Sequence, residues 1–161
     1  MLEVNAPIGN IFLDKGFDEI KSGNFEKLKI SRMELEKRIL RRKGDRGTDV
    51  GFNLDPGVKL RHGDVIDNGD TKIVVEQLPE KVISIRLKTK NMVDVMVLLG
   101  HIIGNRHRPI SIQSEEIVFP IQADSEKEVF TKLFHNIINH IEMTVDERIF
   151  SPHSGADVHE H

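Results

Sequence analysis

The sequence predicts an α+β protein with a β-rich N-terminal domain, and a C-terminal domain that runs strand–helix–strand–strand–helix–strand. Three observations predict this class. Short runs that alternate apolar and polar residues, separated by turn sequences, fill the first half of the chain. After Leu78-Pro79 the pattern of apolar residues changes. Segments long enough for helices, with apolar residues at helical spacing, now lie between strand-like segments. Residues 151–161 are polar and form a short histidine-bearing tail, which we expect to be flexible.

The N-terminal domain is expected over residues 1–78. Residues 39–43 and 48–54 flank Gly44-Asp45-Arg46-Gly47, whose glycines favour a hairpin reversal. Residues 33–42 have the propensities of a helix. We nevertheless expect part of this segment to be a strand, because its neighbours alternate and a hairpin follows.

The C-terminal domain is expected over residues 79–150. Its expected elements are, in order, a strand over 81–88, a helix over 92–103, strands over 110–113 and 117–121, a helix after Ser125 and a last strand around Met143 and Val145. Asn91 is expected to cap the first helix and Gly104 to end it. Ser125 and Glu128 have the spacing of a capping box. This order of elements is that of a ferredoxin-like sandwich.

Composition excludes several classes of site. The 161 residues include no cysteine, so disulfides, thiolate metal sites and cysteine nucleophiles are excluded. Residues 1–12 lack the segments of a signal peptide, and the longest apolar run, 95–99, is too short to span a membrane. We therefore expect a cytoplasmic protein with no membrane partner.

Histidine is the abundant metal ligand that remains, and three of the eight histidines, His153, His159 and His161, lie in the tail. Nothing apolar surrounds them that would bury their rings. Neutral imidazole binds nickel, copper and zinc alike, and a mobile donor arm suits a protein that must release its metal. A solvated tail without a ligand role is the alternative.

His107 is a second candidate, because it follows the end of the first helix of the C-terminal domain. Pro109 prevents the helix from resuming, so His107 is expected at the surface. Taken alone, such a histidine is more often a positive charge favoured by the helix dipole than a metal ligand. His101 lies six residues earlier and would not share a helix face with His107. The remaining histidines, His62, His135 and His140, are expected to be ordinary surface or turn residues.

Enzyme motifs are missing from the sequence, which contains no H-E-x-x-H, G-x-x-x-x-G-K-[ST] or G-x-S-x-G. We expect no catalytic role. An RNA-binding module is an alternative from another class, suggested by the basic residues Lys37, Arg38, Arg41, Arg42, Lys43 and Arg46. Aromatic residues for base stacking do not interleave with them, so we expect no nucleic-acid partner.

Gly104-Asn105-Arg106-His107 resembles the G-N-R-H motif of the UreE family. Residues 50–52 and 60–65 resemble its N-terminal domain, and residues 151–154 resemble the tail, where many members carry a further histidine. The similarity covers nearly the whole chain in the same order. It implies a homodimer with a peptide-binding-like N-terminal domain and a ferredoxin-like metal-binding domain.

The resemblance also implies a function. It implies a nickel metallochaperone that delivers Ni2+ for assembly of the urease active site, with the urease GTPase accessory protein and the urease apoprotein–accessory complex as partners. The implied ligands are His107, shared across the two-fold axis, and the tail residues His153, His159 and His161. Many relatives carry a histidine where this chain has Ile102, so a role for His101 is not transferred. Zn2+ or Cu2+ can substitute at nitrogen ligands, which leaves a general metal-storage protein as an alternative.

Overall fold

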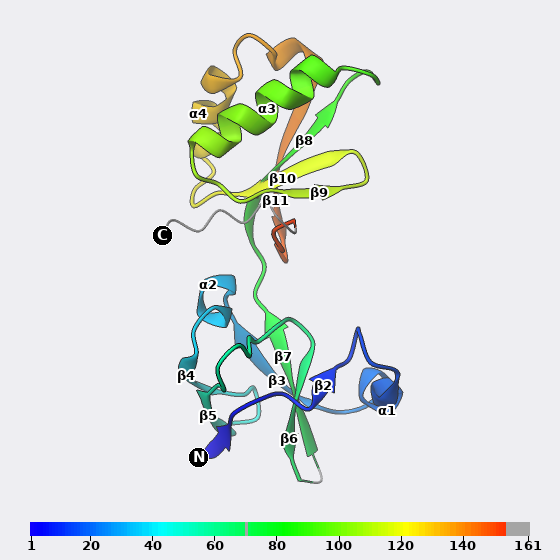
Figure 1. Cartoon of the computed structure of the whole chain (residues 1–161), viewed down its shortest axis with the longest axis vertical. Helices are drawn as coiled ribbons and strands as arrows, with labels where there is room; N and C mark the ends of the chain where they lie inside the picture. The colour runs from blue at the N-terminus through cyan, green and yellow to red at the C-terminus, as the bar shows by residue number, and fades with distance from the viewer. Residues whose placement is uncertain (70, 154–161) are drawn as a thin grey trace. The chain divides into compact units, whose positions relative to one another are not determined.

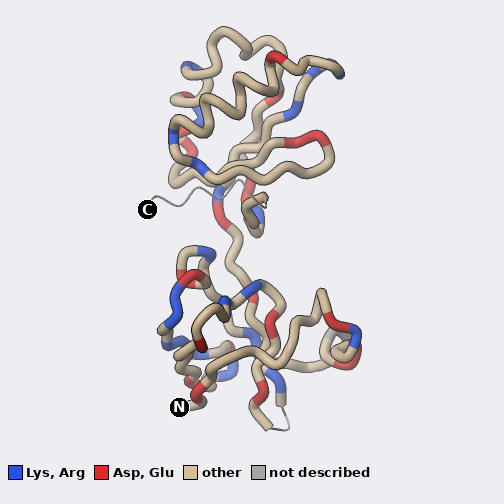
Figure 2. The backbone as a smooth tube through the Cα atoms, viewed as in Figure 1, with Lys and Arg blue, Asp and Glu red and all other residues tan. Residues whose placement is uncertain are grey.

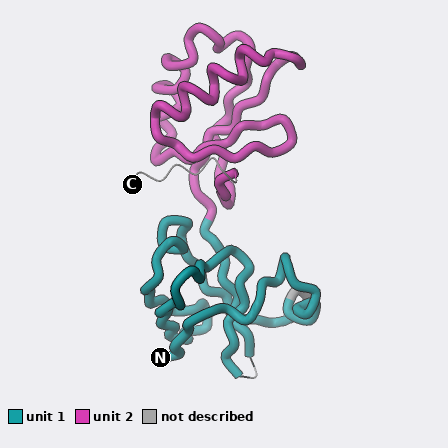
Figure 3. The backbone as a smooth tube through the Cα atoms, viewed as in Figure 1, with its two compact units in different colours: residues 1–78 teal, residues 79–161 magenta. Residues whose placement is uncertain are grey.

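The computed structural model describes residues 1–69 and 71–153 of the chain (Figure 1). By its internal contacts the chain divides into two compact units, residues 1–78 and residues 79–161 (Figure 3). Each unit has a hydrophobic core of its own. Strands dominate unit 1, and unit 2 combines one sheet with helices, which confirms the predicted α+β class.

Unit 1 is built from two small sheets. Its elements are β1 (Leu2–Val4), β2 (Gly9–Asn10), η1 (Lys15–Phe17), α1 (Asp18–Ser22), β3 (Glu26–Ile30), α2 (Arg32–Leu35), β4 (Ile39–Lys43), β5 (Asp49–Asn53), β6 (Asp64–Asn68) and β7 (Thr71–Gln77). The strand orders are β1-β5-β4 and β2-β6-β7-β3. The antiparallel pairing of β4 with β5 confirms the predicted hairpin.

The two sheets of unit 1 share one core, because their alternating apolar side chains meet in a single cluster. Leu40 and Phe52 enter it from the first sheet, and Leu28 and Ile73 from the second. Residues 33–42, which have helix propensity but were expected to be partly strand, contain both a helix and a strand, since α2 precedes β4. A capping box starts α2, in which Glu34 N–H donates to Ser31 Oγ and Ser31 N–H donates to the Glu34 carboxylate (both 3.3 Å).

Unit 2 has the predicted ferredoxin-like topology. Its elements are β8 (Glu80–Leu87), α3 (Val93–Asn105), β9 (Ser111–Gln113), β10 (Glu116–Pro120), α4 (Glu126–Leu133), η2 (Ile138–His140) and β11 (Ile141–Arg148). The strands form one antiparallel sheet in the order β11-β8-β10-β9. Both long helices contribute to the core on one face of the sheet, where Ile85 and Phe119 pack in the same cluster as Leu99 and Phe130.

Of the predicted helix caps in unit 2, only the position of Ser125, the N-cap residue of α4, was correct. Asn91 has a left-handed backbone with φ of 65° and precedes Met92, which occupies the N-cap of α3 without a side-chain bond. Gly104 does not end the helix, which continues to Asn105. Ser125 itself has helical backbone angles and makes no capping bond. The Glu126 carboxylate instead turns back and accepts hydrogen bonds from backbone N–H groups of the preceding loop.

A charged network crosses the sheet of unit 2. Glu116 accepts hydrogen bonds from Arg148 Nη1 (2.8 Å) on β11 and from Arg86 Nε (3.0 Å) on β8. The Arg148 hydrogen bond is the largest influence, and together with Arg86 it lowers the pKa of Glu116 from 4.5 to about 2 against the opposing effect of burial. The carboxylate therefore joins three neighbouring strands while it is ionised.

Glu116→Gln should lower the free energy of unfolding of unit 2 at pH 7 by about 1–2 kcal/mol, after allowance for solvent screening of the half-exposed Arg86. The folded pKa lies below the unfolded value, so the stabilisation is complete above about 4.5 and disappears as the pH falls towards about 2. Urea unfolding of both proteins at a series of pH values measures this. A difference that stays constant down to acidic pH would contradict the assignment to this network.

Candidate metal centre

Helix α3 carries the candidate site at its C-terminal end. One face of the helix is apolar at helical spacing and buries Val95, Leu99 and Ile103 against the core of unit 2. Because these residues span most of the helix, its axis is fixed on the sheet. The position of the residues that follow Asn105 is therefore set by a rigid element.

The end of α3 has the hydrogen bonds of a Schellman motif. The His107 N–H donates to the Gly104 carbonyl oxygen (2.9 Å), and the Arg108 N–H donates to the Ile103 carbonyl oxygen (3.5 Å). This motif requires a left-handed residue directly after the C-cap, usually glycine. His107 occupies that position, with φ of 55°, and its side chain is exposed. The turn thus presents an imidazole at the surface.

Arg108 holds the loop that follows. Its Nη1 donates to the Pro120 carbonyl oxygen (2.9 Å), its Nη2 pairs with Glu126, and its guanidinium lies 5.9 Å from the centre of the Phe130 ring. Burial alone would raise the pKa of Glu126, but hydrogen bonds from Gln122 N–H and Arg108 lower it, so this carboxylate stays ionised. Sequence reasoning did not single out Arg108, because its partners come from β10 and α4.

His153, near the C-terminal end of the chain, lies beside the same loop. Its backbone N–H donates to the carbonyl oxygen of Ile110 (2.7 Å), three residues after His107. Three residues span at most about 11 Å, so His107 and the His153 backbone share one neighbourhood. Phe150 directs the chain there, since it is buried with Val82 and Val118. The His153 side chain is exposed.

The other histidines have different surroundings. His159 and His161 lie outside the described residues. His101 is exposed, and its Nε2 is 3.2 Å from the Asn105 amide nitrogen. His62 belongs to unit 1, where its Nδ1 accepts a hydrogen bond from Gln77 N–H (3.0 Å) and its ring lies 5.1 Å from that of Phe12. His135 and His140 are also exposed.

Within residues 1–69 and 71–153, no three or more His, Cys, Asp or Glu side chains are arranged to hold a metal ion. In the same part of the chain, no helix combines the length and the apolar character needed to cross a membrane.

Two arginines of the basic segment around β4 are paired with carboxylates of unit 1. Arg41 binds the Asp49 carboxylate through Nε (3.0 Å) and Nη2 (2.5 Å), and Arg42 forms an ion pair with Glu34. Hydrogen bonds from Arg41 lower the pKa of Asp49. Figure 2 shows acidic residues among the basic ones in this segment. Two of the six basic residues that suggested RNA binding, Arg41 and Arg42, are therefore compensated locally.

The fold and the helix-end histidine define a two-domain α+β protein that exposes imidazole donors on a ferredoxin-like unit. Residues 6–77 match the N-terminal domain of the UreE urease accessory protein, and residues 80–161 match its C-terminal domain. The chain belongs to the UreE urease accessory protein family, which confirms the resemblance seen at residues 104–107. It is an accessory protein and not an enzyme.

Individual relatives agree with this membership. The chain is 27% identical to the urease accessory protein UreE of Streptococcus vestibularis, over 99% of this chain and 97% of that protein. It is 28% identical to UreE of Staphylococcus epidermidis, over 72% and 73% of the two chains. With UreE of Haemophilus influenzae the identity is 30%, over 70% and 60%. The family supports a role as a chaperone in urease maturation.

His107→Gly should stabilise the metal-free protein. Glycine adopts the left-handed conformation without steric cost, so the free energy of unfolding should rise by about 1 kcal/mol. His107→Ala keeps a Cβ at this position and should give no such gain. Urea unfolding of the three proteins in the presence of a chelator measures the effect. A less stable His107→Gly protein would show that contacts of the imidazole contribute more to the free energy of unfolding than the backbone strain removes.

Proposed function

We propose that this protein is a nickel metallochaperone, which binds Ni2+ through His107 and delivers it for assembly of the urease active site. The observation that carries the proposal is the end of α3, where an exposed imidazole occupies a position suited to glycine. A residue kept at a conformational cost is expected where it serves a function. Membership in the urease accessory family supplies the client.

A second copy of the chain is the proposed partner of α3. Val93 and Val97 are 69% and 65% exposed, and Gly100 and Gly104 continue the same helix face. A Cβ added at either glycine would meet nothing within 4 Å. Glycine destabilises a helix by about 1 kcal/mol relative to alanine, so packing within the protomer does not explain these residues. Close approach of a second α3 would use both the valines and the glycines, and His107 lies at the end of this face.

Such a dimer would supply a suitable ligand set. Ni2+ favours square-planar or tetragonal nitrogen and oxygen surroundings. A two-fold axis would bring together His107 from both chains, and His153 is held near the same loop by its bond to Ile110. His159 and His161 are proposed as further donors. Each ring must be neutral to bind, and ligands on a tail can leave one at a time, so the ion can pass to a partner by ligand exchange.

The proposed recipients are the urease GTPase accessory protein and the urease apoprotein–accessory complex, and the proposed location is the cytoplasm. The same nitrogen ligands accept Zn2+ and Cu2+, so ligand chemistry alone does not distinguish a chaperone from a storage protein. Transfer distinguishes them, because a chaperone must give up its nickel to the recipient complex.

His107→Ala should weaken the tightest nickel site by at least about 100-fold, because removal of a ligand costs more than the 10–100-fold loss seen when its supporting residues are changed. Isothermal calorimetry with Ni2+ measures this on the wild type, on His107→Ala, and on a chain ending at Phe150. The shortened chain should keep the site but bind more weakly. His135→Ala is the control, since His135 is exposed at a distant turn after α4. Unchanged nickel binding by His107→Ala would contradict the proposed site. Equal binding by the shortened chain and the wild type would show that the tail supplies no ligand.

Val97→Lys should convert the dimer to a monomer, because a charge would be buried in the apolar centre of the interface. Sedimentation velocity measures the change. Val129→Lys is the matched control, as Val129 is 46% exposed on α4 rather than α3. Persistence of the dimer in Val97→Lys would show that the interface does not use this face.

A further inference from the structure

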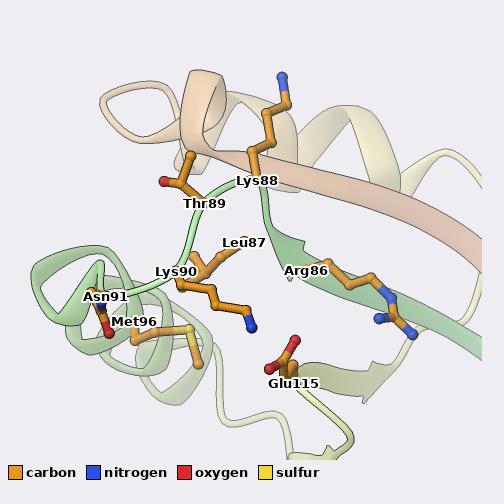
Figure 4. A pocket seen from close by; sticks show the side chains of 8 residues that line it. All are labelled: Arg86, Leu87, Lys88, Thr89, Lys90, Asn91, Met96 and Glu115. Carbon is orange, nitrogen blue, oxygen red and sulfur yellow. The ribbon is translucent and has the colours of Figure 1, made fainter.

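A cavity of about 500 Å³ lies in unit 2, between the β8–α3 loop and the tip of the β9–β10 hairpin (Figure 4). This volume falls within the range of about 300–1,000 Å³ that is usual for ligand sites. The cavity is next to the first residues of α3, whereas His107 follows the last. Thirteen helical residues separate the two ends by about 18 Å, so the cavity is not part of the candidate metal centre.

The lining of the cavity combines an apolar floor with two opposite charges. Leu87 and Met96 are half-buried and form the floor. Lys90 and Glu115 lie on opposite walls, and Figure 4 shows their charged ends pointing toward one another across the cavity. Within the described part of the chain, Lys90 forms no hydrogen bond or ion pair. Its ammonium group is thus available to an anion from outside.

Arg86 adds positive charge at the other side of the cavity, but its guanidinium is already bound to Glu116 (2.8 Å). Glu116 therefore offsets the charge of Arg86, which leaves Lys90 to make the direct contact. Lys88 also belongs to the lining, although its side chain points away from Glu115 in Figure 4. Lys90 points into the cavity and forms no ion pair with the described residues, so it is the group there that attracts a negative charge.

The walls of the cavity are held in an uncommon backbone conformation. Ser114 and Glu115 form a two-residue hairpin turn with φ of 42° and 67°, and Asn91 has φ of 65°. Turns of this kind favour Asn-Gly, and the Ser-Glu pair is less suited to them. These conformations persist only where the surrounding structure enforces them. The geometry of the walls is therefore set before a ligand arrives.

We propose that this cavity binds an acidic segment of a partner protein. A carboxylate of the segment would contact Lys90, and an apolar neighbour would cover Leu87 and Met96. Glu115 selects a peptide over a phosphate group, because it repels a ligand of high negative charge but accepts hydrogen bonds from peptide N–H groups. The identification of the partner as a component of urease maturation rests on the proposed function. The chemistry of the cavity is independent of that function.

The probe for this site is a fluorescein-labelled peptide of alternating Glu and Leu, titrated with the full-length protein and followed by fluorescence anisotropy. Lys90→Glu should weaken binding at least about tenfold, since a charge-assisted contact is replaced by repulsion. Lys127→Glu makes the same charge change at an exposed position of α4 and should bind as the wild type does. A peptide with Gln in place of Glu should not bind.

Glu115→Gln separates a peptide site from a simple anion site. It should weaken binding of the Glu-Leu peptide severalfold, because the amide is a poorer acceptor for N–H groups. Tighter peptide binding by this variant, or displacement of the peptide by millimolar inorganic phosphate, would overturn the proposal in favour of a phosphate ligand. Equal binding by Lys90→Glu and the wild type would overturn it outright.

Nickel calorimetry keeps this test separate from that of the proposed function. Lys90→Glu should bind Ni2+ as the wild type does, and His107→Ala should bind the peptide as the wild type does. Loss of peptide binding in Lys90→Glu alone supports the cavity, whatever the outcome at His107. Loss of nickel binding in Lys90→Glu would instead indicate that the substitution disturbs α3, and would overturn the assignment of the cavity as a separate site.

Discussion

Burial of the apolar face of α3 on the four-stranded sheet positions both proposed sites. Val95, Leu99 and Ile103 fix the helix along its length, so the residues before and after it are set by the same packing. At the C-terminal end the Schellman bonds place His107, and Arg108 is bound to β10 and α4. At the N-terminal end the loop from β8 forms one wall of the cavity that contains Lys90. A change that loosened the helix would disturb both ends together.

Local backbone preferences are broken where function is proposed. In the described part of the chain, the non-glycine residues with positive φ are Asn91, His107, Ser114 and Glu115. One is the candidate metal ligand, and the other three form or adjoin the walls of the cavity. Such conformations cost of order 1 kcal/mol or more each, and the surrounding fold must enforce them. The glycines of α3 are the converse case, because the helix would be more stable with alanine there and only a close neighbour would require them.

The two units differ in how their basic side chains are compensated. In unit 1 the basic residues of β4 are largely compensated by nearby carboxylates, as in the pair of Arg41 with Asp49, so the fold absorbs their charge. In unit 2 the Glu116 carboxylate does the same for Arg86 and Arg148. Lys90 is different, because it faces Glu115 but forms no hydrogen bond or ion pair with a described residue. Imidazoles and an available lysine at opposite ends of one helix would let metal release and partner docking occur on one protomer without competition for the same surface.

The sequence by itself determined the α+β class, the order of the elements in unit 2, the β4–β5 hairpin and the family, because apolar periodicity, turn residues and the Gly104–His107 motif are local signals. It did not determine the N-cap of α3 or the missing capping bond of Ser125, since Asn91 and Ser125 take backbone conformations imposed by the loops around them. Only the tertiary structure decided that Arg108 anchors the loop after His107, that Phe150 returns the chain so that His153 bonds to Ile110, and that Lys90 faces Glu115. Each of these places side by side segments that are distant in sequence, and such segments come together only when the sheet and helices pack.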